Sequence, residues 1–72
     1  MRYLATFYSH YQALSYEKEI EKIGGVGKLK SVPRSLSSSC GTCCEYERDY
    51  PIITGCEAVY EEVDGSWRRI NE

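Results

Sequence analysis

Three of the four cysteines of this chain lie within five residues, in the run Cys40-Gly41-Thr42-Cys43-Cys44, and Cys56 stands apart from them. Cysteine reacts as the thiolate, which nearby cations, amide donors or a helix N-terminus stabilise. A disulfide framework in a small domain spreads its cysteines so that they close loops, and this cluster closes none. The spacing therefore favours nucleophilic, redox or metal chemistry over structural disulfides.

The residues before Cys40 are small and polar, and Arg34 lies earlier in the same predicted loop. Small residues let backbone N–H groups and hydroxyls approach a sulfur anion, and a glycine after the cysteine removes a side chain that would crowd it. Arg34 is a candidate cation for the thiolate, and so are His10 and Lys30. We predict Cys40 as the reactive thiol because a polar loop is exposed. The residues predicted to shape its site are Ser38, Ser39, Gly41 and Arg34.

Two other interpretations of the cysteines stay open. Cys40-x-x-Cys43 has the spacing of metal ligands, and Cys44 and Cys56 would complete a four-thiolate zinc site. The second Cys-x-x-Cys pair of a typical zinc module is missing, and adjacent residues on a strand point to opposite faces. Alternatively, Cys43 and Cys44 are small apolar strand residues that only pack, in a non-catalytic interaction or subunit protein.

Size and composition limit the function classes further. The chain has 72 residues, 42% of them hydrophobic and 28% charged, which predicts a single globular domain over residues 1–72. A net charge of −2 argues against nucleic-acid binding. No apolar run approaches the roughly 20 residues that span a bilayer, and the first residues do not resemble a secretory signal. We expect a cytoplasmic accessory protein without a cofactor, rather than a self-contained enzyme.

The first half of the sequence predicts strand, helix and strand. Residues 3–8 are rich in aromatic residues and predict a strand. Ser9 and Gln12 fit a capping box, after which apolar residues recur at helical spacing until Gly24-Gly25. Residues 27–32 predict a second strand that ends at Pro33. A strand–helix–strand unit of this length predicts a parallel pair with a right-handed crossover.

The second half predicts further strands without a second helix. Residues 42–46 predict a third strand, residues 48–51 a turn, and residues 52–57 no clear element. Asp64-Gly65 predicts a two-residue hairpin. Its register brings opposite charges and apolar partners together. The expected pairs are Val59 with Ile70, Tyr60 with Arg69 and Glu61 with Arg68. The exposed edge of such a hairpin is compatible with a homodimer.

A family resemblance joins several of these features. Thr6-Phe7-Tyr8-Ser9, the helix, Gly27, Val32-Pro33-Arg34 and Ser38-Ser39-Cys40-Gly41 resemble small bacterial proteins called putative selenium/sulfur carrier-like. The likeness covers about residues 1–46. The most specific part is Val-Pro-Arg followed by Ser-x-Cys-Gly.

The resemblance implies that Cys40 carries sulfur or selenium between a donor and an acceptor protein. It also implies a small β-α-β-β-α-β sheet with one helical face. This chain departs from the family pattern at Cys43 and Cys44, where the family has apolar residues, and at its C-terminus, where a hairpin replaces part of a second helix. We therefore expect an α+β fold of truncated ferredoxin-like type. In our hypothesis Arg34 favours the charged form of Cys40, and Cys43 resolves the bound group by disulfide exchange.

Overall fold

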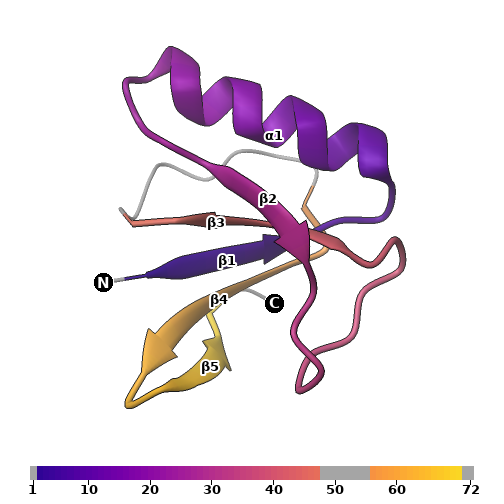
Figure 1. Ribbon diagram of the computed structural model, residues 1–72, viewed down its shortest axis with the longest axis vertical. Coiled ribbons are helices and arrows are strands. Elements are labelled where there is room, and N and C mark those ends of the chain that lie inside the picture. Colours follow the sequence, from indigo (N-terminus) through magenta and orange to yellow (C-terminus); the bar gives the residue numbers. More distant parts are fainter. Residues whose placement is uncertain (1, 48–55, 71–72) are drawn as a thin grey trace.

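One helix lies across one face of a five-stranded antiparallel sheet in the computed structural model, which describes residues 2–47 and 56–70 (Figure 1). The strand order is β2-β3-β1-β4-β5. The predicted α+β fold with a β-α-β-β order and a C-terminal hairpin is confirmed. The predicted turn at 48–51 and residues 52–55 lie outside the described residues. The elements are β1 (Tyr3–Thr6), α1 (His10–Lys22), β2 (Lys28–Ser31), β3 (Thr42–Tyr46), β4 (Ala58–Val63) and β5 (Ser66–Arg69).

The predicted pairing of the first two strands is wrong in one respect. Strands β1 and β2 run in the same direction, but β3 lies between them and pairs antiparallel with both. This is a split β-α-β arrangement. The composition of the strands explains it. Strand β3 has three fully or nearly fully buried side chains, Cys43, Cys44 and Tyr46, whereas the exposed Lys28 and Lys30 of β2 suit the edge of a sheet.

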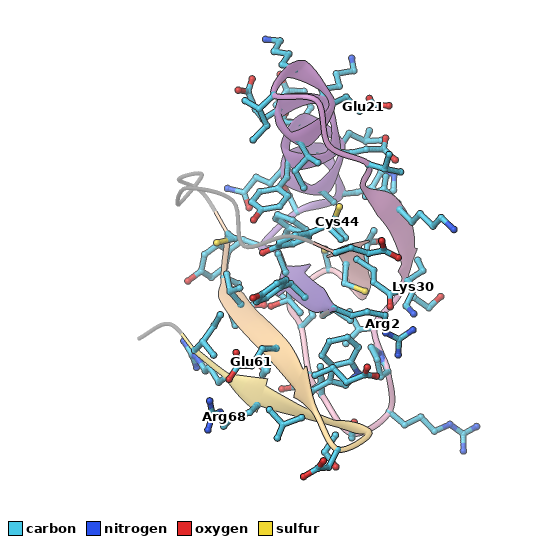
Figure 2. All side chains as sticks on the ribbon, turned by 90° about the vertical axis from the view of Figure 1, so that its left-hand side faces the viewer. Arg2, Glu21, Lys30, Cys44, Glu61 and Arg68 are labelled. Atoms are coloured by element: carbon cyan, nitrogen blue, oxygen red, sulfur yellow. The ribbon has the colours of Figure 1, made fainter. Side chains whose placement is uncertain are left out.

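The main core lies between the sheet and α1. Alternate residues of β1 and β3 face the helix, because successive side chains of a strand point to opposite faces. Tyr16 donates a hydrogen bond from its hydroxyl to that of Tyr46, at 3.1 Å. Figure 2 shows Cys44 pointing toward the helix. The buried cluster comprises Tyr3, Ala5, Phe7, Ala13, Tyr16, Ile20, Cys44 and Tyr46.

Helix α1 begins where the sequence predicts. The Ser9 hydroxyl accepts a hydrogen bond from the Gln12 N–H at 3.3 Å. The Gln12 side chain accepts a bond from the Tyr8 N–H at 3.0 Å, one residue before the cap. The end is also as predicted, since the Gly24 and Gly25 N–H groups bond to the carbonyls of the last turn. The turn that precedes the helix is thereby fixed on the end of β1.

The C-terminal hairpin has the predicted register. Tyr60 is paired with Arg69 and Glu61 with Arg68, and the Ile70 N–H donates to the Val59 carbonyl at 2.9 Å. Pairs of complementary side chains on neighbouring strands stabilise one register of the strands over the others. Strand β4 also pairs antiparallel with β1, with Ala58 opposite Thr6, which fixes the segment that enters β4.

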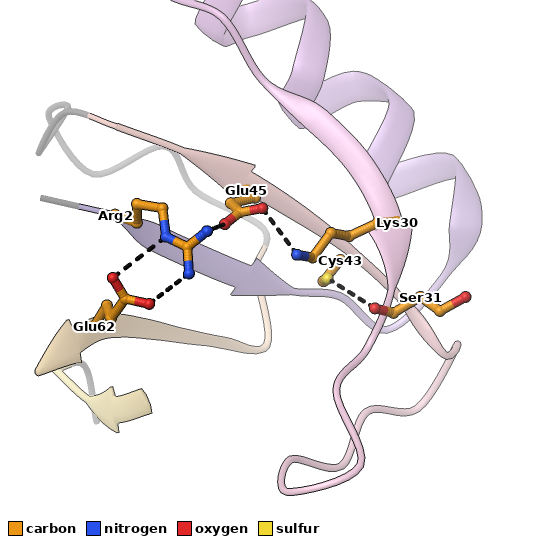
Figure 3. A network of polar contacts seen from close by, with 6 residues as sticks. All are labelled: Arg2, Lys30, Ser31, Cys43, Glu45 and Glu62. Atoms are coloured by element: carbon orange, nitrogen blue, oxygen red, sulfur yellow. Dashed lines mark hydrogen bonds and ion pairs between the residues drawn. The ribbon is translucent and has the colours of Figure 1, made fainter. Parts of the chain in front are cut away.

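The face of the sheet opposite α1 carries a row of charged side chains (Figure 3). Arg2 forms an ion pair with Glu62 and a second one with Glu45, at 3.1 Å from Nη1 to Oε1. Glu45 also bonds to the Lys30 ammonium at 2.9 Å. The row joins β4, β3 and β2 across β1. Within residues 2–47 and 56–70, no helix is long and apolar enough to cross a membrane.

Candidate functional site

Cys40 lies at the end of the sheet where β1 stops and β3 starts. Its thiol donates a hydrogen bond to the Thr42 carbonyl at 3.5 Å. The residue is half-buried, and it packs against the cluster between sheet and helix. The His10 ring, at the start of α1, contacts the Thr42 hydroxyl, with 3.3 Å between Nδ1 and Oγ1. Cys40 is therefore a partly accessible thiol that packs against the core on one side and lies beside polar groups.

The loop between β2 and β3 is held in place by backbone bonds. The Val32 N–H donates to the Gly41 carbonyl at 3.1 Å, which closes the base of the loop. Gly41 has a φ of +73°, and no atom within 4 Å would meet an added Cβ. The glycine is required by the left-handed backbone and not by lack of space. The role of Gly41 in keeping the Cys40 sulfur uncrowded stays a prediction.

The hydroxyls of Ser38 and Ser39 contact other parts of the protein. Ser38 donates to the Phe7 carbonyl at the end of β1, at 3.2 Å. Ser39 donates to the Glu57 carboxylate twice, from its N–H to Oε1 at 3.2 Å and from its hydroxyl to Oε2 at 2.6 Å. The sequence predicts that both serines shape the anion site around Cys40. In this structure they hold the Cys40 loop against the sheet.

The Glu57 carboxylate is stabilised in its charged form by these contacts. The pKa of Glu57 lies below its ordinary value, chiefly because the Ser39 hydroxyl donates to the carboxylate. The Glu57 N–H donates to the Thr6 carbonyl at 2.7 Å, which anchors the residue to β1. Glu57 thus joins the Cys40 loop to the segment that leads into β4.

Cys43 lies in β3 opposite Lys30 of β2. Its side chain is fully buried, and its thiol donates to the Ser31 carbonyl at 3.6 Å (Figure 3). Burial raises the pKa of Cys43 to about 11, although the Lys30 ammonium acts in the opposite direction. The group is a neutral thiol near neutral pH, without solvent access. The role of Cys43 in resolving a group on Cys40 stays a prediction, and it requires a movement that exposes this sulfur.

Cys44 and Cys56 occupy two different surroundings. Cys44 is fully buried under α1, and burial raises its pKa to about 12. An added Cβ on Gly27 would lie only 2.9 Å from the Cys44 sulfur, so this glycine makes room for the thiol. Cys56 is half-buried and packs against the same cluster as Cys40, and its pKa is raised by burial. The packing interpretation suits Cys43 and Cys44.

Two of the predicted cations, Arg34 and Lys30, form no hydrogen bond with the Cys40 thiol within residues 2–47 and 56–70. Arg34 is exposed in the turn that the Leu36 N–H closes on the Pro33 carbonyl. None of the ion pairs found within residues 2–47 and 56–70 includes Arg34. Lys30 bonds to Glu45. The role of Arg34 beside the Cys40 thiol stays a prediction.

A metal site is not formed by the described part of the chain. No three histidine, cysteine, aspartate or glutamate side chains among residues 2–47 and 56–70 are grouped so that they could hold an ion. Cys43 and Cys44 lie on opposite faces of β3, as the alternation of a strand requires. The described residues give the zinc interpretation no support.

Sequence reasoning missed Glu57. Residues 52–57 have no clear pattern, and the contact joins two segments that are 18 residues apart. A loop rich in serine predicts that its hydroxyls donate hydrogen bonds, but the sequence does not identify the residues that accept them. The sequence could have indicated only that a carboxylate beside a cysteine, as in Cys56-Glu57, was a candidate.

Comparison with known proteins gives one match. A family model described as "Putative Se/S carrier protein-like" matches residues 2–58, which include every predicted site residue and also Cys56 and Glu57. No curated protein and no solved structure matches the chain. The match extends beyond the resemblance noted from the sequence, which ended near residue 46.

Proposed function

Because the chain belongs to this family of Se/S carrier-like proteins, we propose that it carries sulfur or selenium on the thiol of Cys40. The observation that supports this choice is accessibility. Of the four cysteines, Cys43 and Cys44 are fully buried, while Cys40 and Cys56 are half-buried. Cys40 is the one that lies in the serine-rich loop, beside an uncrowded glycine. A carrier has to receive and release its cargo at the surface, which excludes the two sealed thiols.

Loading is a transfer of one sulfur atom to the Cys40 thiolate. With a polysulfide donor, the thiolate attacks a terminal sulfur, a new S–S bond forms on Cys40, and the S–S bond to the rest of the donor breaks. The shortened donor leaves with the electron pair, so that charge and atoms balance without an added oxidant or reductant. Delivery reverses this step onto a nucleophile of an acceptor protein.

Arg34 and the loop backbone are proposed to assist the anionic cargo. A persulfide or perselenide is an anion near neutral pH, and Arg34 on the same loop offers an exposed cation that forms no ion pair within residues 2–47 and 56–70. The exposed arginine contributes a screened attraction, since pairs at the surface are weak. The protein partners of the proposed function are a sulfur or selenium donor and an acceptor.

The test is the intact mass of the reduced protein after incubation with inorganic polysulfide. We expect the wild-type chain to gain the mass of one sulfur atom and to lose it again on treatment with a reducing thiol. Cys40→Ser should prevent the gain, whereas Cys56→Ser, which changes the other half-buried thiol, should retain it. Absence of a gain in wild-type protein, or its retention in Cys40→Ser, contradicts the proposal.

A further inference from the structure

Glu57 is the residue that connects the Cys40 loop to the rest of the sheet on the β4 side. Its carboxylate accepts both hydrogen-bond donors of Ser39, the residue directly before Cys40. A carboxylate that accepts two bonds from one residue fixes both the position and the orientation of that residue. Ser39 in turn is connected to Cys40 by a single peptide unit, which transmits the constraint to the Cys40 backbone.

The other contacts of the loop do not replace this one. Ser38 is bonded to the Phe7 carbonyl, and Val32 is bonded to Gly41. These bonds hold the loop toward the β1 end and close its base. The Ser39–Glu57 contact joins the loop to the segment before β4 with two hydrogen bonds to one carboxylate. Its loss would leave the Cys40 backbone held on the β1 and β2 sides alone.

We propose that Glu57 is a positioning residue for Cys40, and that its carboxylate holds the Cys40 loop in the closed conformation in which the thiol is half-buried. This inference rests on the proposed function for its meaning, because it makes Glu57 the group that controls access to the cargo-bearing thiol. The carboxylate acts through Ser39, because the Cys40 thiol itself bonds to the Thr42 carbonyl and not to Glu57.

The two serine hydroxyls of the loop are already used as hydrogen-bond donors. Ser38 and Ser39 direct their hydroxyls to Phe7 and Glu57, so the closed conformation offers neither hydroxyl to an anion on Cys40. Opening the contact with Glu57 would both expose the thiol and free the Ser39 donors. Loading and release are therefore coupled to the opening of this one contact.

The experiment measures how fast each cysteine reacts with iodoacetamide in the folded full-length protein, located by tandem mass spectrometry. The variants are Glu57→Ala, which removes both acceptors, and Ser39→Ala, which removes one donor and keeps the backbone N–H. Glu57→Gln keeps one acceptor oxygen. Glu19→Gln is the matched control, because it makes the same change of charge at an exposed position on α1, where Glu19 forms an ion pair with Lys22.

Glu57→Ala should raise the labelling rate of Cys40 several-fold, up to about tenfold, which is the shift in a two-state equilibrium that an ordinary hydrogen bond produces; the Ser39–Glu57 bonds are solvent-exposed, so the larger value for a buried charged group does not apply. Ser39→Ala and Glu57→Gln should lie between Glu57→Ala and the wild type, and Glu19→Gln should equal the wild type. Cys43 and Cys44 should stay protected in every variant, which separates opening of the loop from unfolding of the domain.

Two results would overturn the inference. One is a Cys40 labelling rate in Glu57→Ala that equals the wild type. The other is a parallel increase at Cys40, Cys43 and Cys44, which shows that Glu57 only stabilises the fold. Neither depends on sulfur loading, so the positioning role can fail while Cys40 still gains sulfur, and it can hold in a protein that gains none.

Discussion

The close approach of Gly27 to Cys44 gives a prediction whose sign depends on the packing beneath α1. A Cβ added to Gly27 would lie 2.9 Å from the Cys44 sulfur and 3.5 Å from Ile20 Cδ1. Ordinary contacts between non-bonded heavy atoms are about 3.5–4.0 Å. The φ of Gly27 lies outside the left-handed region, so an alanine there meets a steric obstacle and no backbone strain.

The magnitude follows from two opposed effects. Glycine to alanine at a compatible position stabilises by about 0.4–1 kcal/mol, because it lowers the entropy of the unfolded chain. Overpacking a closed core costs about 1–3 kcal/mol. The sulfur of Cys44 is fully buried, so it has little room to retreat. We expect Gly27→Ala to lower the free energy of unfolding by about 1–2 kcal/mol, equivalent to about 4–8 °C in Tm for each kcal/mol in a domain of this size.

The assay is urea unfolding of four proteins: wild type, Gly27→Ala, Cys44→Ala and the double variant. Removing the sulfur makes room for the new methyl group, so the double variant should be about as stable as Cys44→Ala alone. The resulting coupling energy should be about 1–2 kcal/mol. A Gly27→Ala protein at least as stable as the wild type, or costs that simply add in the double variant, would refute the packing described for Cys44.

Three further predictions follow from the buried thiols and the loop. The folded-state pKa values of Cys43 and Cys44, about 11 and 12, lie above the ordinary value of 9, so their contribution to stability is complete below pH 9 and is lost as the pH rises toward those values. Between pH 8 and pH 10 the free energy of unfolding, measured with urea, should fall by about 3 kcal/mol because of the two thiols together. The fall should be correspondingly smaller in Cys43→Ala/Cys44→Ala, and an equal fall in that variant would contradict the assignment of this pH dependence to the two thiols. Gly41→Ala should lower the free energy of unfolding by about 1–2 kcal/mol because of the left-handed backbone, and Gly41→Asn should cost less, as thermal unfolding can measure; equal costs for the two variants would argue against this explanation. Arg34→Gln should slow loading by polysulfide with no change in Tm, and an unchanged loading rate would remove Arg34 from the site.

The parts of the fold that local sequence determines were predicted from it. Ser9 marks the start of α1 because a hydroxyl there satisfies a free N–H of the first turn. Asp64-Gly65 marks the hairpin, and the charges and apolar residues on both sides set its register. The position of β3 was not predicted, because it depends on which strand gains most from a central place. Cys43, Cys44 and Tyr46 fill that place, and the lysines of β2 are left at the edge.

The sequence indicated which residue types form the candidate site, but not which residues they contact. A polar, glycine-containing loop identified Cys40 as the accessible cysteine of the cluster, and strand alternation indicated that Cys43 and Cys44 face opposite sides. The partners of Ser38 and Ser39 could not be predicted, because hydrogen bonds between distant segments leave no periodic pattern in the sequence. Glu57 was missed for that reason, although its carboxylate accepts two hydrogen bonds from the Cys40 loop.

The central claim is that Cys40 is the residue that bears the cargo, and the most direct test is to locate the added atom. Protein loaded with polysulfide is capped with iodoacetamide and fragmented in tandem mass spectrometry. We predict that the extra sulfur is found on Cys40, between the cysteine sulfur and the capping group, and that Cys43 and Cys44 carry none. Extra sulfur on Cys56 with an unmodified Cys40 would contradict the account.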